Sequence, residues 1–189
     1  MKTFLAAIAL VSTLLVGAAQ AEPEAFYAAE KVGIWQTFGV TGDGERNPVC
    51  FAVAEWPDGS NIQYTKDLAD GEMYIRIYNV DWDISDEPGT RVQGRVNFYI
   101  DDQFTVGGTS EILVLNHNTI VLPNLEPTKI TPAFMENHVM KVVMPGTTSN
   151  IAVSLNGSSD AIQNLAKCMV EYDMKDPSEK TPTVPGRDA

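Results

Sequence analysis

The sequence is poor in cysteine, histidine and positive charge, and each shortage excludes a class of function. It has two cysteines and two histidines among 189 residues, too few for a multi-cysteine zinc module or an iron–sulfur cluster. Lysine and arginine number 13 against 25 acidic residues, a net charge of −12 that would repel a phosphate backbone. We therefore expect neither a cofactor nor a nucleic-acid partner.

The residue spacings of known catalytic sites are also missing. The sequence contains no Gly-x-Ser-x-Gly elbow, and His117 and His138 stand at neither an H-x-H nor an H-E-x-x-H spacing. The segments Gly42-Asp43-Gly44 and Gly107-Gly108 have the composition of turns and lack the strand-to-helix pattern of a phosphate-binding loop. We predict no catalytic residues. A hydrolase that uses one of the two histidines as a general base is the least favoured alternative.

Long hydrophobic runs are confined to the N-terminus, where residues 1–21 have the pattern of a secretion signal. Lys2 supplies a short positive region, an apolar stretch follows over 4–16, and Ala19-Gln20-Ala21 is a small-x-small cleavage site. The apolar stretch is shorter than the ~20 residues that span a bilayer, and an uncleaved anchor helix is the alternative. We expect cleavage near Ala21, a periplasmic or secreted protein, and no transmembrane segment in the mature chain.

Export changes the interpretation of the two cysteines. Cys50 and Cys168 are the only pair, and an oxidising compartment allows them to form a disulfide. Two unrelated buried thiols are the alternative. The pair is too far apart for a C-x-x-C redox motif, so disulfide exchange chemistry is not expected. A bridge between them would tie the start of the fold to its end.

The mature chain has the hydrophobic alternation of a β-sheet protein. In the segment 91–100, apolar residues and Gly94 alternate with polar ones and Tyr99, which predicts a strand with one buried and one wet face, followed by a turn at Asp101-Asp102. The pattern predicts an all-β protein, an antiparallel β-sandwich of about eight or nine strands. The other expected strands, separated by glycine, proline, asparagine and aspartate clusters, are 32–38, 49–54, 72–78, 103–106, 112–115, 119–122, 139–144 and 150–155.

One α-helix is expected at the C-terminal end of the domain, packed on the sandwich. Ser158, Ser159 and Asp160 offer N-cap oxygens and a negative charge for the helix start. An apolar stripe then recurs at helical spacing: Ile162, Leu165, Ala166, Met169 and Tyr172. The predicted organisation is a lead-in at 22–31, the sandwich domain with its helix at 32–173, and a disordered tail at 174–189 that is rich in proline and charge.

The densest acidic cluster suggests a calcium site as one alternative. Oxygen ligands at alternate positions suit calcium, and the cluster comprises Asp81, Asp83, Asp86 and Glu87. It is not an EF-hand, because aspartate and Val92 stand where that loop needs glycine and a final glutamate. The simpler interpretation is a solubilising loop between strands, with Trp82 packed on the sheet.

Three arginines are notable because positive charge is scarce. The candidate partner contact comprises Arg76, Arg91, Arg95 and Trp82. The simpler interpretation of the three arginines is that they pair with carboxylates on neighbouring strands. We expect most of the tryptophans to fill the core. The alternative is an aromatic patch on the surface that binds a sugar. The residues available for such a patch are Trp35, Trp56, Trp82, Tyr64, Tyr74, Tyr78 and Tyr99.

The order of several short motifs resembles a known family. A tryptophan strand at Trp35 precedes the cysteine strand Cys50-Phe-Ala, an Ile100-Asp101 turn follows, and the segment Ser154-Leu-Asn-Gly-Ser leads into a helix that contains Leu-Ala-Lys-Cys168. Over residues 32–170 the chain thereby resembles the invasion-associated locus B family of exported proteobacterial proteins, although that family often has further cysteines near the first strand. The resemblance implies a periplasmic or surface-linked β-sandwich without established catalysis and with a link to host association.

These features together predict an exported, non-enzymatic binding or envelope-accessory protein that acts by protein recognition. Its acidic surface favours a basic partner, and inhibition of a cationic lytic enzyme such as lysozyme is one specific form of this hypothesis. The alternative is a carbohydrate-binding module that uses surface aromatics, with calcium assisting at residues 81–87.

Overall fold

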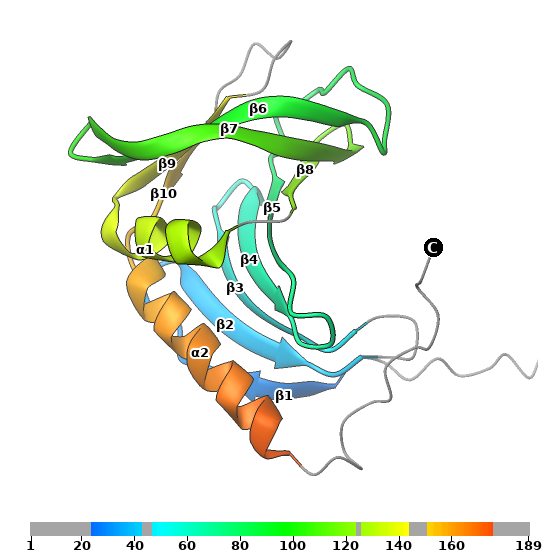
Figure 1. Cartoon of the computed structure of the whole chain (residues 1–189), viewed down its shortest axis with the longest axis vertical. Helices are drawn as coiled ribbons and strands as arrows, with labels where there is room; N and C mark the ends of the chain where they lie inside the picture. The colour runs from blue at the N-terminus through cyan, green and yellow to red at the C-terminus, as the bar shows by residue number, and fades with distance from the viewer. Residues whose placement is uncertain (1–23, 43–46, 124–125, 144–150, 176–189) are drawn as a thin grey trace, which may run out of the picture.

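In the part of the chain that the structure describes, ten strands form a single antiparallel sheet in the order β1-β2-β3-β4-β5-β8-β7-β6-β9-β10 (Figure 1). The computed structural model describes residues 24–42, 47–123, 126–143 and 151–175, so the expected signal peptide, residues 43–44 and most of the expected tail lie outside the described residues. The elements are β1 (Ala25–Ala28), β2 (Trp35–Val40), β3 (Val49–Glu55), β4 (Asn61–Asp67), β5 (Met73–Tyr78), β6 (Arg91–Ile100), β7 (Gln103–Asn116), β8 (Thr119–Leu122), α1 (Pro127–Glu136), β9 (Val139–Val143), β10 (Ile151–Ser154) and α2 (Ser158–Met174).

The antiparallel all-β class and the C-terminal helix are confirmed, while the strand count and the layering differ in detail from the expectation. β1 falls in the expected lead-in, and β4 falls where no strand was expected. The expected strands at 103–106 and 112–115 are parts of one 14-residue strand, β7, so the prediction of a turn at Gly107-Gly108 was wrong.

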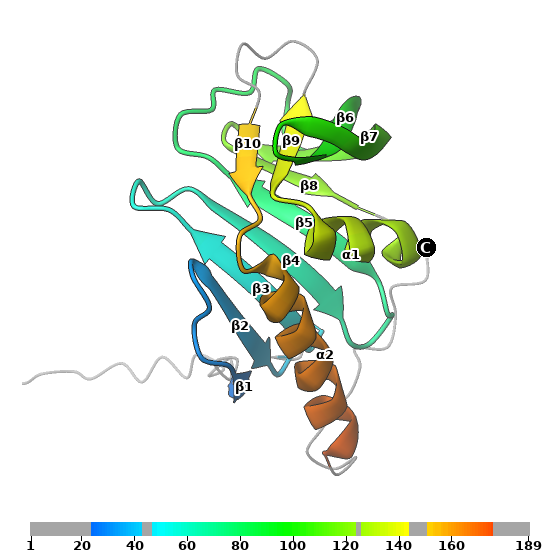
Figure 2. The same cartoon turned by 90° about the vertical axis from the view of Figure 1, so that its left-hand side faces the viewer.

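The layering differs because one short strand joins the two halves of the sheet. β8 pairs with β5 on one side and with β7 on the other, so the strands form one continuous sheet and not two separate ones. This sheet is strongly curved, and both helices lie on its concave side (Figures 1 and 2). The curvature lets one sheet enclose a core that two facing sheets were expected to provide.

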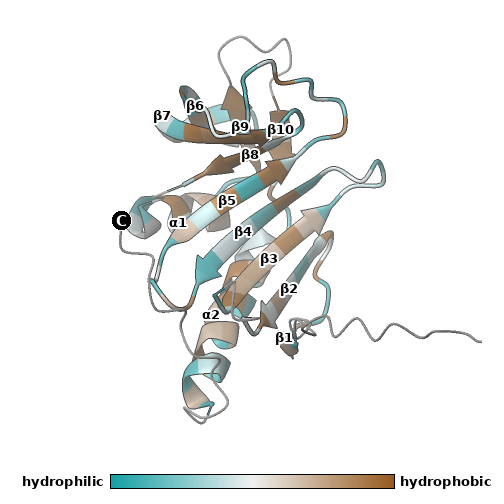
Figure 3. Cartoon of the chain, turned by 90° about the vertical axis from the view of Figure 1, so that its right-hand side faces the viewer, coloured by the Kyte–Doolittle hydropathy of each residue, from teal (hydrophilic) through white to brown (hydrophobic). Residues whose placement is uncertain are grey.

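The predicted alternation along β6 is confirmed by its burial. Gly94, Val96 and Phe98 are buried on the concave side, while Arg91 and Arg95 are exposed on the convex side. The turn that follows is also confirmed: Asp101 and Asp102 adopt positive φ angles of 47° and 64°, as a two-residue hairpin turn requires. Figure 3 shows a similar alternation along β5, whereas β3 and β8 are mostly apolar.

The concave side is centred on Phe134, a buried residue of α1, a helix that the sequence analysis did not predict. Its ring centroid lies 5.6 Å from that of Trp35, 5.1 Å from that of Tyr64 and 6.5 Å from that of Phe98, which joins three strands to one helix. The Tyr64 hydroxyl also forms a 2.8 Å hydrogen bond with the Thr131 hydroxyl, and burial raises the pKa of Tyr64. These contacts fix α1 against the inner wall of the sheet.

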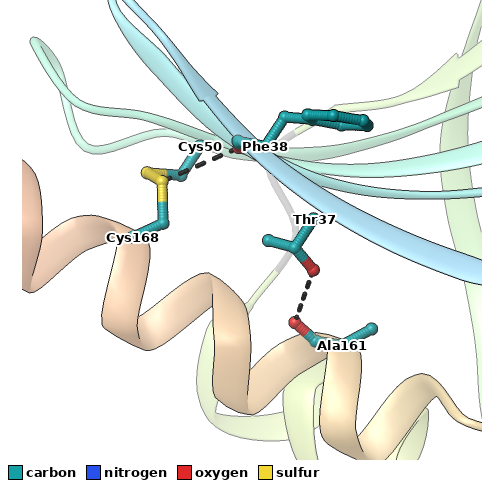
Figure 4. The surroundings of a disulfide bond; sticks show 5 residues. All are labelled: Thr37, Phe38, Cys50, Ala161 and Cys168. Carbon is teal, nitrogen blue, oxygen red and sulfur yellow. Dashed lines mark hydrogen bonds between the residues drawn. A yellow bond between two sulfur atoms is a disulfide. The ribbon is translucent and has the colours of Figure 1, made fainter. Parts of the chain in front are cut away.

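The predicted disulfide is confirmed and fastens α2 to the sheet (Figure 4). Cys50 on β3 and Cys168 on α2 are 118 residues apart in sequence, with their Cα atoms 6.1 Å apart. Gly39 lies opposite Cys50 on β2, and a Cβ there would come within 2.6 Å of the Cys168 sulfur. About two turns nearer the N-terminus of α2, the buried Thr37 hydroxyl donates a hydrogen bond to the carbonyl of Ala161 (3.2 Å).

The start of α2 differs from the prediction. Its N-cap is Gly157 at φ 88°, and no side-chain oxygen caps the helix. The hydroxyl of Ser158 instead donates to the carbonyl of Phe134 (2.5 Å), which joins α2 to α1. Of the expected apolar stripe, Ile162, Leu165 and Tyr172 are buried, Met169 is half-buried and Ala166 is exposed. Among the described residues, neither helix has the length and apolar composition needed to cross a bilayer.

We predict that the double variant Cys50→Ala/Cys168→Ala is less stable by about 4 kcal/mol, because the bridge closes a long loop and restricts the unfolded chain. Equilibrium denaturation in urea measures the difference. Val170→Ala, an exposed position on the same helix, is the control and should leave the free energy of unfolding unchanged. A loss below ~1 kcal/mol in the double variant would show that the bridge contributes little to stability.

Candidate functional site

An apolar groove of about 410 Å³ opens on the concave side between β7 and α1. Its floor comes from β5, β6 and the end of β8, and its two sides come from β7 and α1. The lining residues are Ile75, Val96, Phe98, Val106, Gly107, Gly108, Thr109, Ser110, Glu111, Leu122, Pro123, Glu126, Lys129, Ile130 and Ala133. This groove is the candidate functional site.

The groove exists because β8 is much shorter than its neighbour β7. β8 has 4 residues and β7 has 14, and the register pairs β8 only with Leu113, Val114 and Asn116. β8 ends at Leu122, and Pro123 has no N–H group to continue the ladder. Among the described residues, no strand lies beside residues 103–112 of β7 on that side, and we call this empty strand position the open lane.

The hydrogen-bond pattern identifies which backbone groups of β7 face the open lane. Val114 donates to the carbonyl of Thr90 (2.9 Å) and accepts from the amide of Gly89 (2.8 Å), so its backbone groups point toward the side of β6. In an antiparallel pair this orientation alternates with every residue. Ser110 and Gly108 therefore also face β6.

The intervening residues Gly107, Thr109 and Glu111 present their N–H and C=O groups to the open lane. Within the described chain, none of their amides or carbonyls has a backbone partner across the lane. All three residues also line the apolar groove. The site thus combines an unpaired strand edge with an adjoining apolar surface.

The two glycines of β7 differ in what surrounds them. At Gly107 a Cβ would lie 2.5 Å from the carbonyl oxygen of Val96, so a side chain there would collide with β6. At Gly108, on the groove side of the strand, a Cβ would meet no atom within 4 Å. The missing side chain at Gly108 therefore leaves the groove open next to Val96.

The charged residues on the groove rim are already paired with one another. Lys129 Nζ lies 2.6 Å from Glu126 Oε2, and Glu111 forms a salt bridge with Arg91 across β6 and β7. Both pairs are largely exposed, so they contribute little to stability. Because their charges are matched, the groove offers backbone hydrogen bonds and apolar contact, with no unpaired charge among its described lining residues.

A buried amide holds α1 at a fixed distance from β7. Asn137, directly after α1, donates from its side chain to the carbonyl of Ala133 (2.7 Å) and accepts a hydrogen bond from the hydroxyl of Thr105 on β7. Asn137 is 6% exposed. Together with Phe134, this contact gives the groove a rigid second wall.

The structure does not bring the predicted partner-contact residues together. Arg76 and Arg91 lie in one row across the convex face, separated by Val121 and Leu113. Three strand spacings therefore separate the two arginines, a distance of about 14 Å. Arg95 lies four residues further along β6. Trp82 is 7% exposed and belongs to the core, which agrees with the simpler interpretation of its loop.

The acidic loop does not assemble a metal site. Trp82 and Ile84 are buried, and alternation along the loop leaves Asp81, Asp83 and Glu87 exposed and pointing away from the core. Throughout the described part of the chain, no three histidine, cysteine or acidic side chains gather as a metal-ligand set. Asp86, the fourth acidic residue of the loop, is half-buried and also belongs to no such set of ligands.

The two histidines lie in separate places and contact no nucleophile in the described part of the chain. His117 Nδ1 is 3.4 Å from the carbonyl of Ile84, and His138 Nδ1 is 3.1 Å from the Asp101 carboxylate. His138 is more than half exposed. This arrangement gives the hydrolase alternative no support.

The tryptophans are not arranged as a surface patch. Trp35 is 1% exposed and Trp56 is half-buried. The exposed aromatic surface lies elsewhere, where Phe104 packs edge-on against Tyr99 with ring centroids 6.0 Å apart. Lys141 lies over the Tyr99 ring, 4.5 Å from its centroid. Burial raises the pKa of Tyr74, which lies on β5 away from this pair.

Sequence reasoning missed the groove, although one local signal marked it. Glycine inside a strand often indicates a place where another backbone or a ligand approaches closely. Gly107-Gly108 lies inside a long strand, although its composition predicts a turn. The remaining lining residues come from β5, β6, β8 and α1, and only the folded chain brings them together.

Comparison with known proteins adds no relative: no family model, no curated protein and no solved structure matches the chain. The resemblance to the invasion-associated locus B family therefore stays a prediction.

We predict an alternating pattern of amide hydrogen exchange along β7 in the free protein. The amides of Gly108, Ser110 and Ile112 should exchange at least about a hundredfold more slowly than those of Gly107, Thr109 and Glu111, because the first set is bonded to β6 and the second faces the open lane. Residue-resolved NMR exchange measures these rates. Equal protection of both sets would show that the lane is already filled.

Proposed function

We propose that the protein is an exported binding protein that recognises a protein partner in the groove between β7 and α1. The observation that carries this proposal is the unpaired edge of β7 beside an apolar groove. Unsatisfied backbone groups and exposed apolar surface at one place are costly in water, and a bound protein segment relieves both costs. Val106, 43% exposed at this edge, is one such apolar residue.

Export is supported by the disulfide and by the secretion-signal pattern at residues 1–21. We place the mature protein in the periplasm or outside the cell, after cleavage near Ala21. The net charge of −12 supports a basic partner, because complementary charge speeds association and disfavours acidic competitors.

A carbohydrate-binding module finds less support. Sugar recognition by stacking needs exposed aromatic rings, and two of the three tryptophans are buried. Phe104, whose ring packs against half-buried Tyr99, is the one exposed aromatic side chain among the described residues that this alternative could use.

A photo-crosslinking experiment tests protein recognition at the groove. With p-benzoylphenylalanine in place of Val106, irradiation of the tagged protein in its own envelope fraction should give a discrete protein adduct. The same probe at Val170, which is 56% exposed on α2 and does not line the groove, is the matched control and should give none. The partner identified by mass spectrometry should then bind the wild-type protein when purified.

The proposal fails if adducts form equally at both positions, or if the adduct at Val106 is missing. It also fails if the purified partner binds equally well after Gly108→Val, a change that places a side chain in open groove space.

Inhibition of a cationic lytic enzyme is the specific form of this proposal that is quickest to examine. If lysozyme is the partner class, purified mature protein should lower its rate of cell-wall lysis in proportion to the complex formed, and added salt should weaken the effect because the attraction is electrostatic. Unchanged lysozyme activity at a large molar excess would exclude this form.

A further inference from the structure

We infer that the groove binds its partner by strand addition: one extended peptide segment enters the open lane and pairs antiparallel with β7. This inference rests on the proposed function and specifies how the partner is recognised. The occupant is a segment with apolar residues at alternate positions, no charge at those positions, and basic residues at its flanks.

The backbone geometry requires an extended occupant. Gly107, Thr109 and Glu111 direct their N–H and C=O groups into the open lane at the two-residue spacing of a strand. Residues 107–111 of β7 span about 14 Å, enough for three paired positions of an added strand. An edge with this pattern is the surface that strand addition uses.

The direction follows from β8, which already occupies the same line of the sheet. β8 runs antiparallel to β7 and stops at Leu122, where Pro123 turns the chain toward α1. An antiparallel peptide in the open lane would continue both the line and the pairing direction of β8. Antiparallel pairing is also slightly more stable for each residue than parallel pairing.

The side-chain preference follows from the groove lining. In an added strand, alternate side chains point to the concave face, toward Val96, Phe98 and Ile130. Gly108 and Ser110 leave space above this floor for a side chain of medium size, such as valine or leucine. The rim charges of the groove are paired with each other, so a charged residue at an inward position would lack a partner.

The flanking preference follows from the charge of the whole chain. Its net charge of −12 attracts lysine and arginine outside the groove, where water separates them from individual carboxylates.

The shape of the site selects a single segment over a second copy of this chain. α1 forms the opposite wall, with Ile130 and Ala133 facing the same groove, so a complete second sheet cannot reach the edge of β7 there. An acyl chain would fill the apolar part but leave the amides and carbonyls of the lane unpaired. An extended peptide satisfies both requirements.

Three nonapeptides serve as probes: Lys-Thr-Val-Thr-Val-Thr-Val-Thr-Lys and its two analogues with leucine or phenylalanine in place of valine, each with a fluorescent label. We expect at least one to bind with a dissociation constant below 1 mM, measured by fluorescence anisotropy. Binding should slow exchange at the amides of Gly107, Thr109 and Glu111 by at least about tenfold, whereas Gly108 and Ser110, already bonded to β6, should change little.

A matched pair of variants on β7 separates the groove from the rest of the strand. Gly108→Val fills the groove next to Val96 and should weaken binding at least about tenfold, because a Cβ there meets open space and the fold tolerates it. Leu115→Val, at an exposed position of the same strand that lies outside the open lane and does not line the groove, should bind as the wild type does. Circular dichroism checks that both variants are folded.

A matched pair of modified peptides tests the hydrogen bonds themselves. N-methylation of every second amide of the best probe blocks one set of donors, and the alternative version blocks the other set. One version should bind at least about tenfold more weakly and the other should retain binding, since only one set of amides faces β7.

Strand addition is wrong if no probe binds, if binding leaves the three lane amides unprotected, if Gly108→Val binds equally well, or if both N-methylated versions behave alike. Concentration-dependent dimerisation that protects the same amides without probe would assign the lane to a second copy and would also overturn it. If no probe binds but the Val106 adduct still forms, strand addition is wrong and protein recognition at the groove is retained. If the probes do not bind and the adduct does not form, protein recognition at the groove is wrong as well.

Discussion

β8 is the strand on which the architecture depends, because its four residues join the two halves of the sheet. On one side they pair with β5 and, through it, with β1 to β4; on the other they pair with β7 and, through it, with β6, β9 and β10. The strand is apolar and mostly buried, as a position inside the sheet requires. Its shortness has a second effect: beyond Leu122 the neighbouring strand β7 continues without a partner on that side in the described chain.

The concave side shows how the site keeps its shape. Phe134 packs against aromatic rings from three strands, Asn137 joins the end of α1 to β7, and Ser158 joins α1 to α2. The disulfide then fastens α2 to β3. The wall opposite β7 is thus tied to the sheet at several places, so the groove is already formed and binding there would have a small ordering cost.

Local patterns in the sequence were sufficient for the strand faces and the disulfide. Val96 and Phe98 alternate with arginine and asparagine because one face of β6 is packed and the other is wet, and this period is visible in the residues themselves. Cys50 and Cys168 were paired because no other cysteine exists and export permits oxidation. In β4 the same signal is shorter, because only Ile62 and Tyr64 are apolar among its seven residues, and the pattern predicts no strand there.

The helix α1 and the groove depend on contacts that the local sequence does not show. Pro132 inside a ten-residue helix suggests a break, yet the packing of Phe134 outweighs the poor helix propensity. The open lane follows from where β8 ends relative to β7, which is a property of two strands paired in space. The Gly107-Gly108 pair is typical of turns, so its place inside a strand becomes clear only from the register with β6.

The central claim, that the lane beside Gly107–Glu111 is open in the free protein, is tested most directly by nuclear Overhauser contacts in the mature chain. The Hα protons of Gly108 and Ser110 point into the lane, because their N–H and C=O groups face β6. The structure predicts that neither Hα shows a contact to the Hα of another strand, while Thr109 shows one to Arg95 on β6. A cross-strand contact from Gly108 or Ser110 to another segment of the chain would mean that the lane is occupied, and would contradict this account of the site.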